Sequence, residues 1–367
     1  MAIETPPLEA EIRRLISIAG PMPIAQYMAI CLCHPIHGYY MTRDPFGASG
    51  DFITAPEISQ MFGELIGLWA AAVWRQMGSP KSLRLVELGP GRGTMMADAL
   101  RAAKVVPAFH AAIAVHLVEV SPALQQMQQQ TLESIGVTLS WHDTLGEVPE
   151  GPAIILANEF FDALPVHQAV RQDDGWHERV VSVDKNGDFV LGALLQPLPQ
   201  LERLLPPSVR SAPVGSIFEW RTDSVALEIG RRVKRTGGAA LVIDYGHMKS
   251  EVGDTVQAVG EHAYANPLVA PGLVDLTAHV DFQSLAEAAE SIGAAIHGPL
   301  HQGEFLRRLG IETRAASLKA KAPRDKASDI EGQVERLIGQ GARRMGILFK
   351  VMGIADPKLG VLTGFEK

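Results

Sequence analysis

The residues best suited to chemistry follow one short apolar run, Leu83 to Leu88. An acid within it, Glu87, is followed by glycines at positions 89, 91 and 93. Glycine lacks a Cβ atom, so it adopts positive φ and lets a ligand lie against the main chain. From Thr94 the chain is rich in good helix formers, and the free N–H groups of a first helical turn attract a carboxylate or phosphate. The pattern predicts a nucleoside-containing cofactor at a strand-to-helix turn. The alternative is an ordinary glycine-rich turn.

Spacing argues against two common nucleotide sites. A dinucleotide fingerprint, G-x-G-x-x-G counted from Gly89, requires a third glycine where Thr94 stands. A phosphate loop requires G-K-[ST], which does not follow the turn. The pattern that the sequence does contain is E-x-G-x-G-x-G, which ends with Gly91 and Gly93. A second acid, Glu119, follows the next apolar run. An acid in that place accepts hydrogen bonds from the two ribose hydroxyls. The alternative interpretation is that Glu119 is an ordinary acidic residue on the surface.

Four apolar runs alternate with helical stretches and predict the elements that position these residues. The runs are 83–88, 114–118, 137–141 and 153–157. This alternation predicts a doubly wound α/β domain with a parallel sheet, whose ligands bind beyond the carboxyl ends of the strands. Those ends carry Glu87, Glu119, Asp143 and Asn158. We expect Asp143 to accept a hydrogen bond from an adenine amino group. The alternative is that Trp141 is buried in the core and Asp143 is solvated, without a role in binding.

The first part of the chain, residues 1–78, is predicted to form a helical N-terminal cap. Residues 8–19 and 56–77 have helical patterns, and the loop between them is broken by proline and glycine. Residues 79–367 then form the main domain.

Two insertions are predicted in that domain. One, at about 166–215, contains short strands, and the other, at about 245–280, is rich in loops. Residues 239–244 predict the fifth core strand and residues 347–352 a closing edge strand. The basic stretch 319–326 predicts a solvated charged loop.

Composition limits the class of protein. A formal net charge of -8 over 367 residues argues against broad nucleic-acid binding. Cys31 and Cys33 are too close in sequence for a structural disulfide or a four-ligand zinc site, which suggests a reducing compartment. No apolar run reaches 18 residues, and the N-terminus does not resemble a targeting peptide. We therefore expect a cytoplasmic protein without membrane insertion.

The glycine pattern and its second acid resemble motif I of class I S-adenosylmethionine-dependent methyltransferases. Three further segments occur along the chain in the same order, relative to motif I, as in the MidA-like family, and they resemble that family. It includes a mitochondrial complex I assembly methyltransferase. They are 50–64 (GDFITAPEIS, then FGE), 158–165 (NEFFDALP) and 276–282 (LTAHVDF).

The resemblance implies a class I methyltransferase fold, which is a Rossmann-like seven-stranded sheet, with S-adenosyl-L-methionine as cofactor. For the mitochondrial relative it also implies symmetric dimethylation of an arginine in the 49-kDa subunit of complex I. The motif I glycines carry over as cofactor-binding positions, and the 158–165 segment as the substrate-side loop.

Methyl transfer to an arginine sets a physical requirement for that loop. The pKa of a guanidinium exceeds 12, so the group is held by carboxylates rather than deprotonated in advance. Glu159 and Asp162 are the predicted catalytic carboxylates, although Asp162 could instead cap a helix. The displacement must be aligned and dry, and it requires no metal. Other predicted substrate-side residues are Asn158, Phe160, Phe161, Asp51, Thr54 and Glu57.

Two other functions remain open from the sequence. The cap and insertions equally permit a methyltransferase that acts on a small molecule. A non-catalytic assembly or scaffold protein that retains a cofactor fold is the second, although the intact glycines and acids argue against it.

Overall fold

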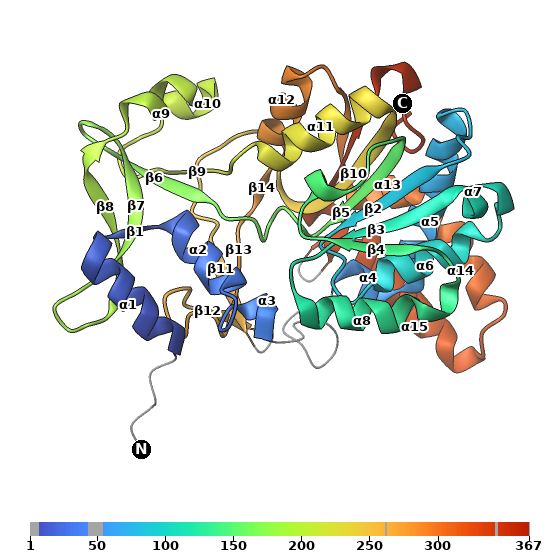
Figure 1. Cartoon of the computed structure of the whole chain (residues 1–367), viewed down its shortest axis with the longest axis horizontal. Coiled ribbons are helices and arrows are strands. Elements are labelled where there is room, and N and C mark those ends of the chain that lie inside the picture. Colours follow the sequence, from blue (N-terminus) through green and yellow to red (C-terminus); the bar gives the residue numbers. More distant parts are fainter. Residues whose placement is uncertain (1–6, 43–53, 261–262, 342–343, 367) are drawn as a thin grey trace. The chain divides into compact units, whose positions relative to one another are not determined.

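The computed structural model describes residues 7–42, 54–260, 263–341 and 344–366 (Figure 1). The chain divides into two compact units, each made of three segments. Unit 1 comprises Met1–Phe52, Asp162–Thr222 and Lys249–Asp281. Unit 2 comprises Ile53–Phe161, Asp223–Met248 and Phe282–Lys367.

Unit 2 is built around a twisted sheet whose order is β15-β16-β10-β5-β2-β3-β4. The strands from β10 to β4 are parallel, while β16 pairs antiparallel with both β10 and β15. The central strands are almost continuously apolar because both of their faces are buried. The strands are β2 (Leu83–Leu88), β3 (Ile113–Val118), β4 (Leu139–His142), β5 (Ala153–Asn158), β10 (Gly238–His247), β15 (Ala295–His301) and β16 (Phe349–Ala355).

Helices cover both faces of this sheet, as expected for a doubly wound fold (Figure 1). Helix α5 packs against α6, β5 and β10, and α11 packs against β5, β10 and β16. The helices of unit 2 are α4 (Ala55–Ile58), α5 (Gln60–Gln76), α6 (Thr94–Ala103), α7 (Pro107–Ala112), α8 (Pro122–Leu132), α11 (Ser224–Thr236), α12 (Phe282–Ser291), α13 (Gln302–Arg308), α14 (Ile311–Lys319), α15 (Arg324–Ile338) and α16 (Met345–Leu348).

The four predicted parallel strands and the fifth core strand are confirmed, but the predicted edge strand is wrong. Residues 349–355 form β16, which lies between β10 and β15 in the sheet. The edge is β15, whose half-buried sequence AIHGPLH lacks an apolar run and shifts register between His297 and Leu300. The predicted charged loop at 319–326 is confirmed only over residues 320–323, because α14 ends at Lys319 and α15 already begins at Arg324.

Unit 1 contains two small antiparallel sheets and short helices. The larger sheet has the order β1-β7-β6-β9 with β8 paired to β7, and the smaller has the order β12-β11-β13. The β-strands predicted in the first insertion are therefore confirmed. The elements are α1 (Pro7–Ala19), β1 (Met22–Pro23), α2 (Ile24–Cys33), α3 (Tyr39–Thr42), β6 (His167–Gln172), β7 (Gly175–Val183), β8 (Phe189–Pro197), α9 (Pro199–Leu204), α10 (Pro207–Arg210), β9 (Ile217–Trp220), β11 (Gln257–Gly260), β12 (Ala263–Ala265) and β13 (Asp275–Thr277).

The compact units divide the chain at other positions than the predicted domains. Helices α1 to α3 of the predicted cap belong to unit 1, whereas α4 and α5 belong to unit 2. The reason is the composition of α5, which buries side chains nearly all round, including Phe62, Trp69 and Trp74, in the core of unit 2. The boundary at residue 78 stays a prediction.

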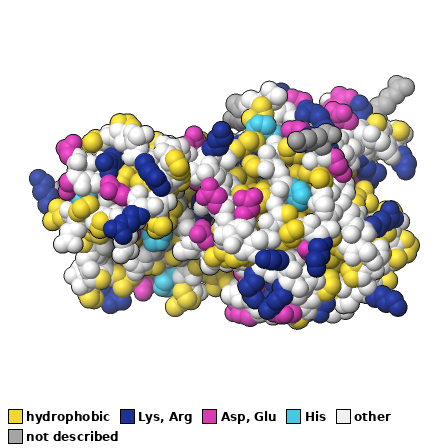
Figure 2. Space-filling model, turned by 90° about the horizontal axis from the view of Figure 1, so that it is seen from above, with side chains coloured by type: hydrophobic (Ala, Val, Ile, Leu, Met, Phe, Trp, Pro, Cys, Tyr) yellow, Lys and Arg dark blue, Asp and Glu magenta, His cyan; other side chains and the backbone are white. Residues whose placement is uncertain are grey.

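The surface carries charges of both signs. Figure 2 shows Lys and Arg side chains interspersed with Asp and Glu side chains over the face in view. None of the described helices combines the length and the apolar character that are needed to span a bilayer.

Candidate functional site

The glycine turn joins β2 to α6 in unit 2. Gly89, Gly91 and Gly93 all have positive φ, at 60°, 54° and 80°. The Gly93 N–H donates to the Pro90 carbonyl at 2.8 Å, and Gly93 is the residue that precedes the first turn of α6. The backbone is thus folded tightly and leads directly into a helix N-terminus, as predicted for a site that binds its ligand through the main chain.

Glu87 is buried on β2, one residue before the end of that strand. Its side chain is 3% exposed, and burial raises the pKa of its carboxyl group to about 8. Among the residues that the structure describes, its Oε2 atom has no hydrogen-bond partner. The same holds for Oδ1 of Asn158, at the end of the neighbouring strand β5. Two buried acceptors at adjacent strand ends therefore suit a ligand that brings hydrogen-bond donors or positive charge.

Glu119 follows β3 directly. Its Oε1 atom accepts a hydrogen bond from the Ser121 backbone N–H at 2.9 Å, and its Oε2 atom accepts one from Gln128 at 3.2 Å. Burial raises the pKa of Glu119 to about 7, while these hydrogen bonds oppose the shift. The carboxylate is therefore fixed in orientation at the strand end where a ribose was predicted to bind.

Gln128 on α8 is a residue that sequence reasoning missed. It is fully buried, and it connects three parts of the predicted cofactor site. Its amide nitrogen donates to the Gly91 carbonyl at 2.8 Å and to Glu119, and its Oε1 accepts from the Trp141 indole at 2.8 Å. The signal was present in the sequence, since this glutamine lies on the buried face of α8 between Leu124 and Leu132.

Asp143, the predicted adenine acceptor, lies just beyond β4 and is exposed. Its backbone N–H donates to Glu147 at 3.0 Å. The preceding residue, His142, has a ring nitrogen 3.0 Å from one of His116, and burial lowers the pKa of both imidazoles. Asp143 therefore has a more open setting than Glu119.

Glu159 follows β5 and has an uncommon backbone conformation. Its φ is +49°, a left-handed value that non-glycine residues rarely adopt. Its N–H donates to the Ile243 carbonyl of β10 at 2.9 Å. Its Oε1 atom accepts from the Ala55 backbone N–H at 3.3 Å and from the Asn158 amide at 3.2 Å. The structure thus presents this carboxylate at a strained position, which is typical of functional sites.

The two phenylalanines after Glu159 differ in exposure. Phe161 is buried, whereas Phe160 is half-buried and packs edge to face against it with ring centroids 5.4 Å apart. A Cβ atom built on Gly89 would lie 3.0 Å from the Phe160 ring. The turn after β5 and the glycine turn after β2 are therefore in direct contact.

The predicted segment around Asp51, Thr54 and Glu57 is described only in part. Asp51 lies outside the described residues. Thr54 precedes α4, and Glu57 in α4 accepts a hydrogen bond from the Thr94 hydroxyl at 2.6 Å. Since Ala55 also donates to Glu159, α4 contacts both the start of α6 and the turn after β5.

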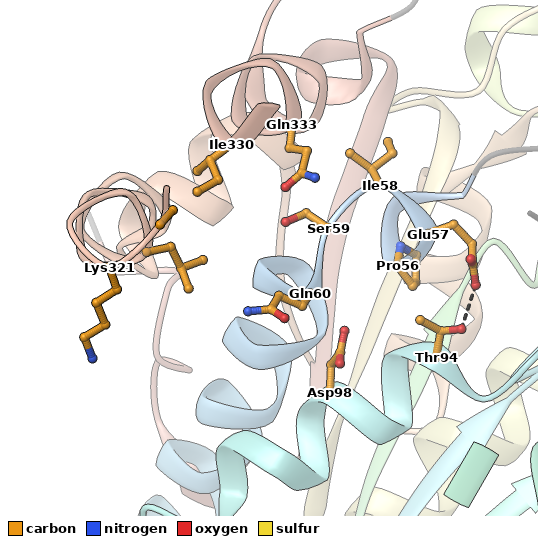
Figure 3. A pocket seen from close by; sticks show the side chains of 12 residues that line it. Pro56, Glu57, Ile58, Ser59, Gln60, Thr94, Asp98, Lys321, Ile330 and Gln333 are labelled. Carbon is orange, nitrogen blue, oxygen red and sulfur yellow. Dashed lines mark hydrogen bonds between the residues drawn. The ribbon is translucent and has the colours of Figure 1, made fainter. Parts of the chain in front are cut away.

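A cavity of about 570 Å³ lies beside this contact in unit 2. Figure 3 shows the Glu57–Thr94 hydrogen bond at one side of it, with Asp98 and Gln333 also lining it. Burial raises the pKa of Asp98, and Arg101 at 2.7 Å opposes the shift. The cavity is lined by both polar and apolar side chains, and the glycine turn is not among its lining residues.

Asp162, the second predicted catalytic carboxylate, begins a segment of unit 1 and is 5% exposed. Its carbonyl accepts from the Ala278 N–H at 3.1 Å. Arg221, another residue that sequence reasoning missed, donates to four carbonyls, those of Asp162, Leu164, Ala278 and His279. Arg221 therefore connects, within unit 1, two of the segments that carry the family resemblance.

The sheet order and the glycine turn define a Rossmann-like fold of the class I methyltransferase type. The chain belongs to the family described as putative S-adenosyl-L-methionine-dependent methyltransferase, whose model matches residues 65–300. S-adenosyl-L-methionine is accordingly its cofactor. The positive-φ glycines, the fixed Glu119 carboxylate and the buried acceptors on Glu87 and Asn158 fit a cofactor with ribose hydroxyls and positive charge.

Named relatives cover most of the chain. The protein arginine methyltransferase NDUFAF7 homolog, mitochondrial, of Drosophila melanogaster is 40% identical over 95% of this chain and 84% of its own length. The human protein arginine methyltransferase NDUFAF7, mitochondrial, is 38% identical over 84% of this chain and 74% of its own length. A crystal structure from Burkholderia thailandensis, bound to S-adenosyl-homocysteine, has a TM-score of 0.82 and 29% identity over 98% of this chain and 94% of that chain.

Proposed function

We propose that this chain is a protein arginine N-methyltransferase and that Glu159 orients the substrate guanidinium. The observation that carries the proposal is the Glu159 carboxylate, held at a left-handed backbone position beside the cofactor turn. The names of the relatives support the choice of arginine over other acceptors.

The residues divide the work between cofactor and acceptor. The cofactor supplies an electrophilic methyl group on a sulfonium. We assign its binding to Glu87, the three glycines and Glu119, with Asp143 on the adenine side. On the acceptor side, Glu159 accepts hydrogen bonds from the guanidinium and aims one nitrogen, and Asp162 is the proposed second carboxylate.

The side chains around Glu159 exclude water from the acceptor side and hold the Glu159 carboxylate in place. The Phe160 ring lies against Gly89 of the glycine turn, and we propose that its aromatic face packs on the substrate cation. Asn158 and Ala55 donate to the Glu159 carboxylate and so limit its rotation. Asp51, Thr54 and Glu57 are proposed to line the approach of the substrate.

A finer proposal concerns the substrate protein. The family resemblance points to symmetric dimethylation of an arginine in the 49-kDa-type subunit of respiratory complex I. The predicted cytoplasmic location stays a prediction, and the names of the Drosophila and human relatives describe those proteins as mitochondrial.

The test is transfer of labelled methyl groups from S-adenosyl-L-methionine to the recombinant 49-kDa-type subunit, followed by mass spectrometry of the modified residue. Wild type should label an arginine, and Glu159→Gln should lower the rate about a hundredfold, as for a lost acid–base or orienting group. Glu228→Gln, which changes a half-buried carboxylate on α11, should keep the wild-type rate. Label on a lysine of the subunit, or no label on the subunit at all, would contradict the proposal.

A further inference from the structure

Asp244 is a fully buried carboxylate within β10, three residues before that strand ends at His247, and neither the glycine turn nor the acceptor-side motif includes it. Its Oδ1 atom accepts from the Tyr245 backbone N–H at 2.9 Å, and its Oδ2 atom accepts from the Phe161 backbone N–H at 2.9 Å. A buried carboxylate that accepts two main-chain N–H groups holds those segments firmly, because each group loses its partner if the carboxylate is removed.

The second of these hydrogen bonds attaches the turn after β5 to the neighbouring strand. The Glu159 N–H already donates to the Ile243 carbonyl of β10. Two residues later, the Phe161 N–H donates to Asp244, the residue that follows Ile243. The backbone is therefore fixed to β10 on both sides of Phe160, and the left-handed φ of Glu159 is enclosed between the two attachments.

These attachments fix the position of the Glu159 side chain. A left-handed glutamate is unfavourable in itself and persists only where surrounding contacts impose it. The Phe161 attachment is one such contact, and the packing of Phe160 against Gly89 is another. If the Phe161 N–H is released, Glu159 can relax toward ordinary φ values, and its carboxylate moves away from Ala55 and Asn158.

We propose that Asp244 is a positioning residue for methyl transfer, acting through the Phe161 N–H to hold the Glu159 carboxylate where the acceptor guanidinium binds. This inference rests on the proposed function of Glu159. Asp244 does not touch the acceptor in this scheme.

The variant Asp244→Asn tests the proposal with little change of volume. An asparagine side chain has one acceptor oxygen where aspartate has two, so one of the two backbone N–H groups loses its partner. The matched control is Asp356→Asn, because Asp356 is also a buried aspartate of unit 2 and accepts a backbone N–H, from Lys358 at 3.1 Å.

Hydrogen exchange gives a readout that does not depend on the acceptor. In wild type, the Phe161 amide should exchange as slowly as amides within β5, although it lies beyond that strand. In Asp244→Asn, exchange in residues 158–164 should rise about tenfold or more, while the glycine turn and the calorimetric Kd for S-adenosyl-homocysteine stay unchanged. Rapid exchange of Phe161 in wild type, or unchanged exchange in the variant, overturns the inference.

A double-mutant cycle on the methyl-transfer rate separates positioning from general destabilisation. Asp244→Asn should lower kcat about tenfold without raising the cofactor KM, and should have no further effect in the Glu159→Ala background. If Glu159→Ala is impaired and the two losses multiply, the inference alone is overturned. If Glu159→Ala keeps the wild-type rate, the proposed function of Glu159 and this inference fall together.

Discussion

Two turns of unit 2 share a left-handed backbone conformation and differ in the residues that adopt it. After β2, the left-handed positions are glycines, and we propose that the main chain itself faces the cofactor there. After β5, the left-handed residue is Glu159, which keeps a side chain at a cost of about 1 kcal/mol relative to glycine. Under the proposed function, this difference means that the cofactor side requires backbone access, whereas the acceptor side requires a carboxylate.

The two turns also differ in how their surroundings fix them. On the cofactor side, Gln128 joins the glycine turn to Glu119 through side-chain hydrogen bonds. On the acceptor side, Asp244 and Ile243 hold the backbone on either side of Phe160. Substitutions at the first set should therefore change cofactor affinity, and substitutions at the second set should change the rate of transfer.

The largest effect on affinity is expected from Gly89→Ala. A Cβ atom there adds strain at φ 60° and meets the Phe160 ring at 3.0 Å, so cofactor binding should weaken by about 2 kcal/mol, roughly thirtyfold in Kd. Gly136→Ala is the matched control, since Gly136 has φ 78° and open space around it. Calorimetry with S-adenosyl-homocysteine measures both. Equal Kd values for the two variants would contradict a role for Gly89 in the site.

A smaller loss is expected from Gln128→Leu. The leucine fills the buried position but leaves the Gly91 carbonyl, the Trp141 indole and one Glu119 oxygen without this partner, which should raise the Kd about tenfold. The exposed neighbour Gln129→Leu should bind as wild type does. A Kd for Gln128→Leu within twofold of wild type, in the same titration, would remove Gln128 from the site.

The next prediction concerns pH. Since burial raises the pKa of Glu87 from 4.5 to about 8, its proton stabilises the ligand-free fold, and this contribution is lost as the pH rises from about 5 through 8. Glu87→Gln has no such loss. Its Tm should therefore match wild type or fall below it at pH 5 and exceed it at pH 9. Parallel Tm curves for the two proteins between these pH values would show that Glu87 does not titrate in this range.

The smallest expected effect is on the free energy of unfolding, and it tests directly the difference between the two turns. Glu159→Gly removes the strain of a side chain at φ +49° and should raise the free energy of unfolding by up to about 1 kcal/mol in urea titration. The same variant should lose methyl transfer as fully as Glu159→Ala. A destabilised Glu159→Gly would mean that the carboxylate contributes more to the fold than the strain costs.

The sequence predicted the cofactor side better than the acceptor side, for a physical reason. The glycines and Glu119 occupy positions set by one strand, one turn and one helix, so their spacing is readable along the chain. Gln128 contacts Gly91, 37 positions away, Arg221 contacts residues 57 to 59 positions away, and Asp244 contacts Phe161, 83 positions away. The pattern of α8 indicates that Gln128 is buried, but no local pattern encodes which residues these three side chains contact. The edge strand β15 was missed because Gly298-Pro299 interrupts it and its residues are only half-buried on both faces.

The position of β16 has a consequence for synthesis of the chain on the ribosome. Residues 349–355 lie near the end of the sequence, yet the strand they form covers one side of β10, which is made more than 100 residues earlier. Until β16 emerges, β10 is an apolar strand with one open edge of unpaired N–H and C=O groups, and other nascent chains can pair with that edge. Premature termination just before residue 349 should therefore yield an aggregating product, even though the glycine turn and every residue assigned to chemistry have already been translated.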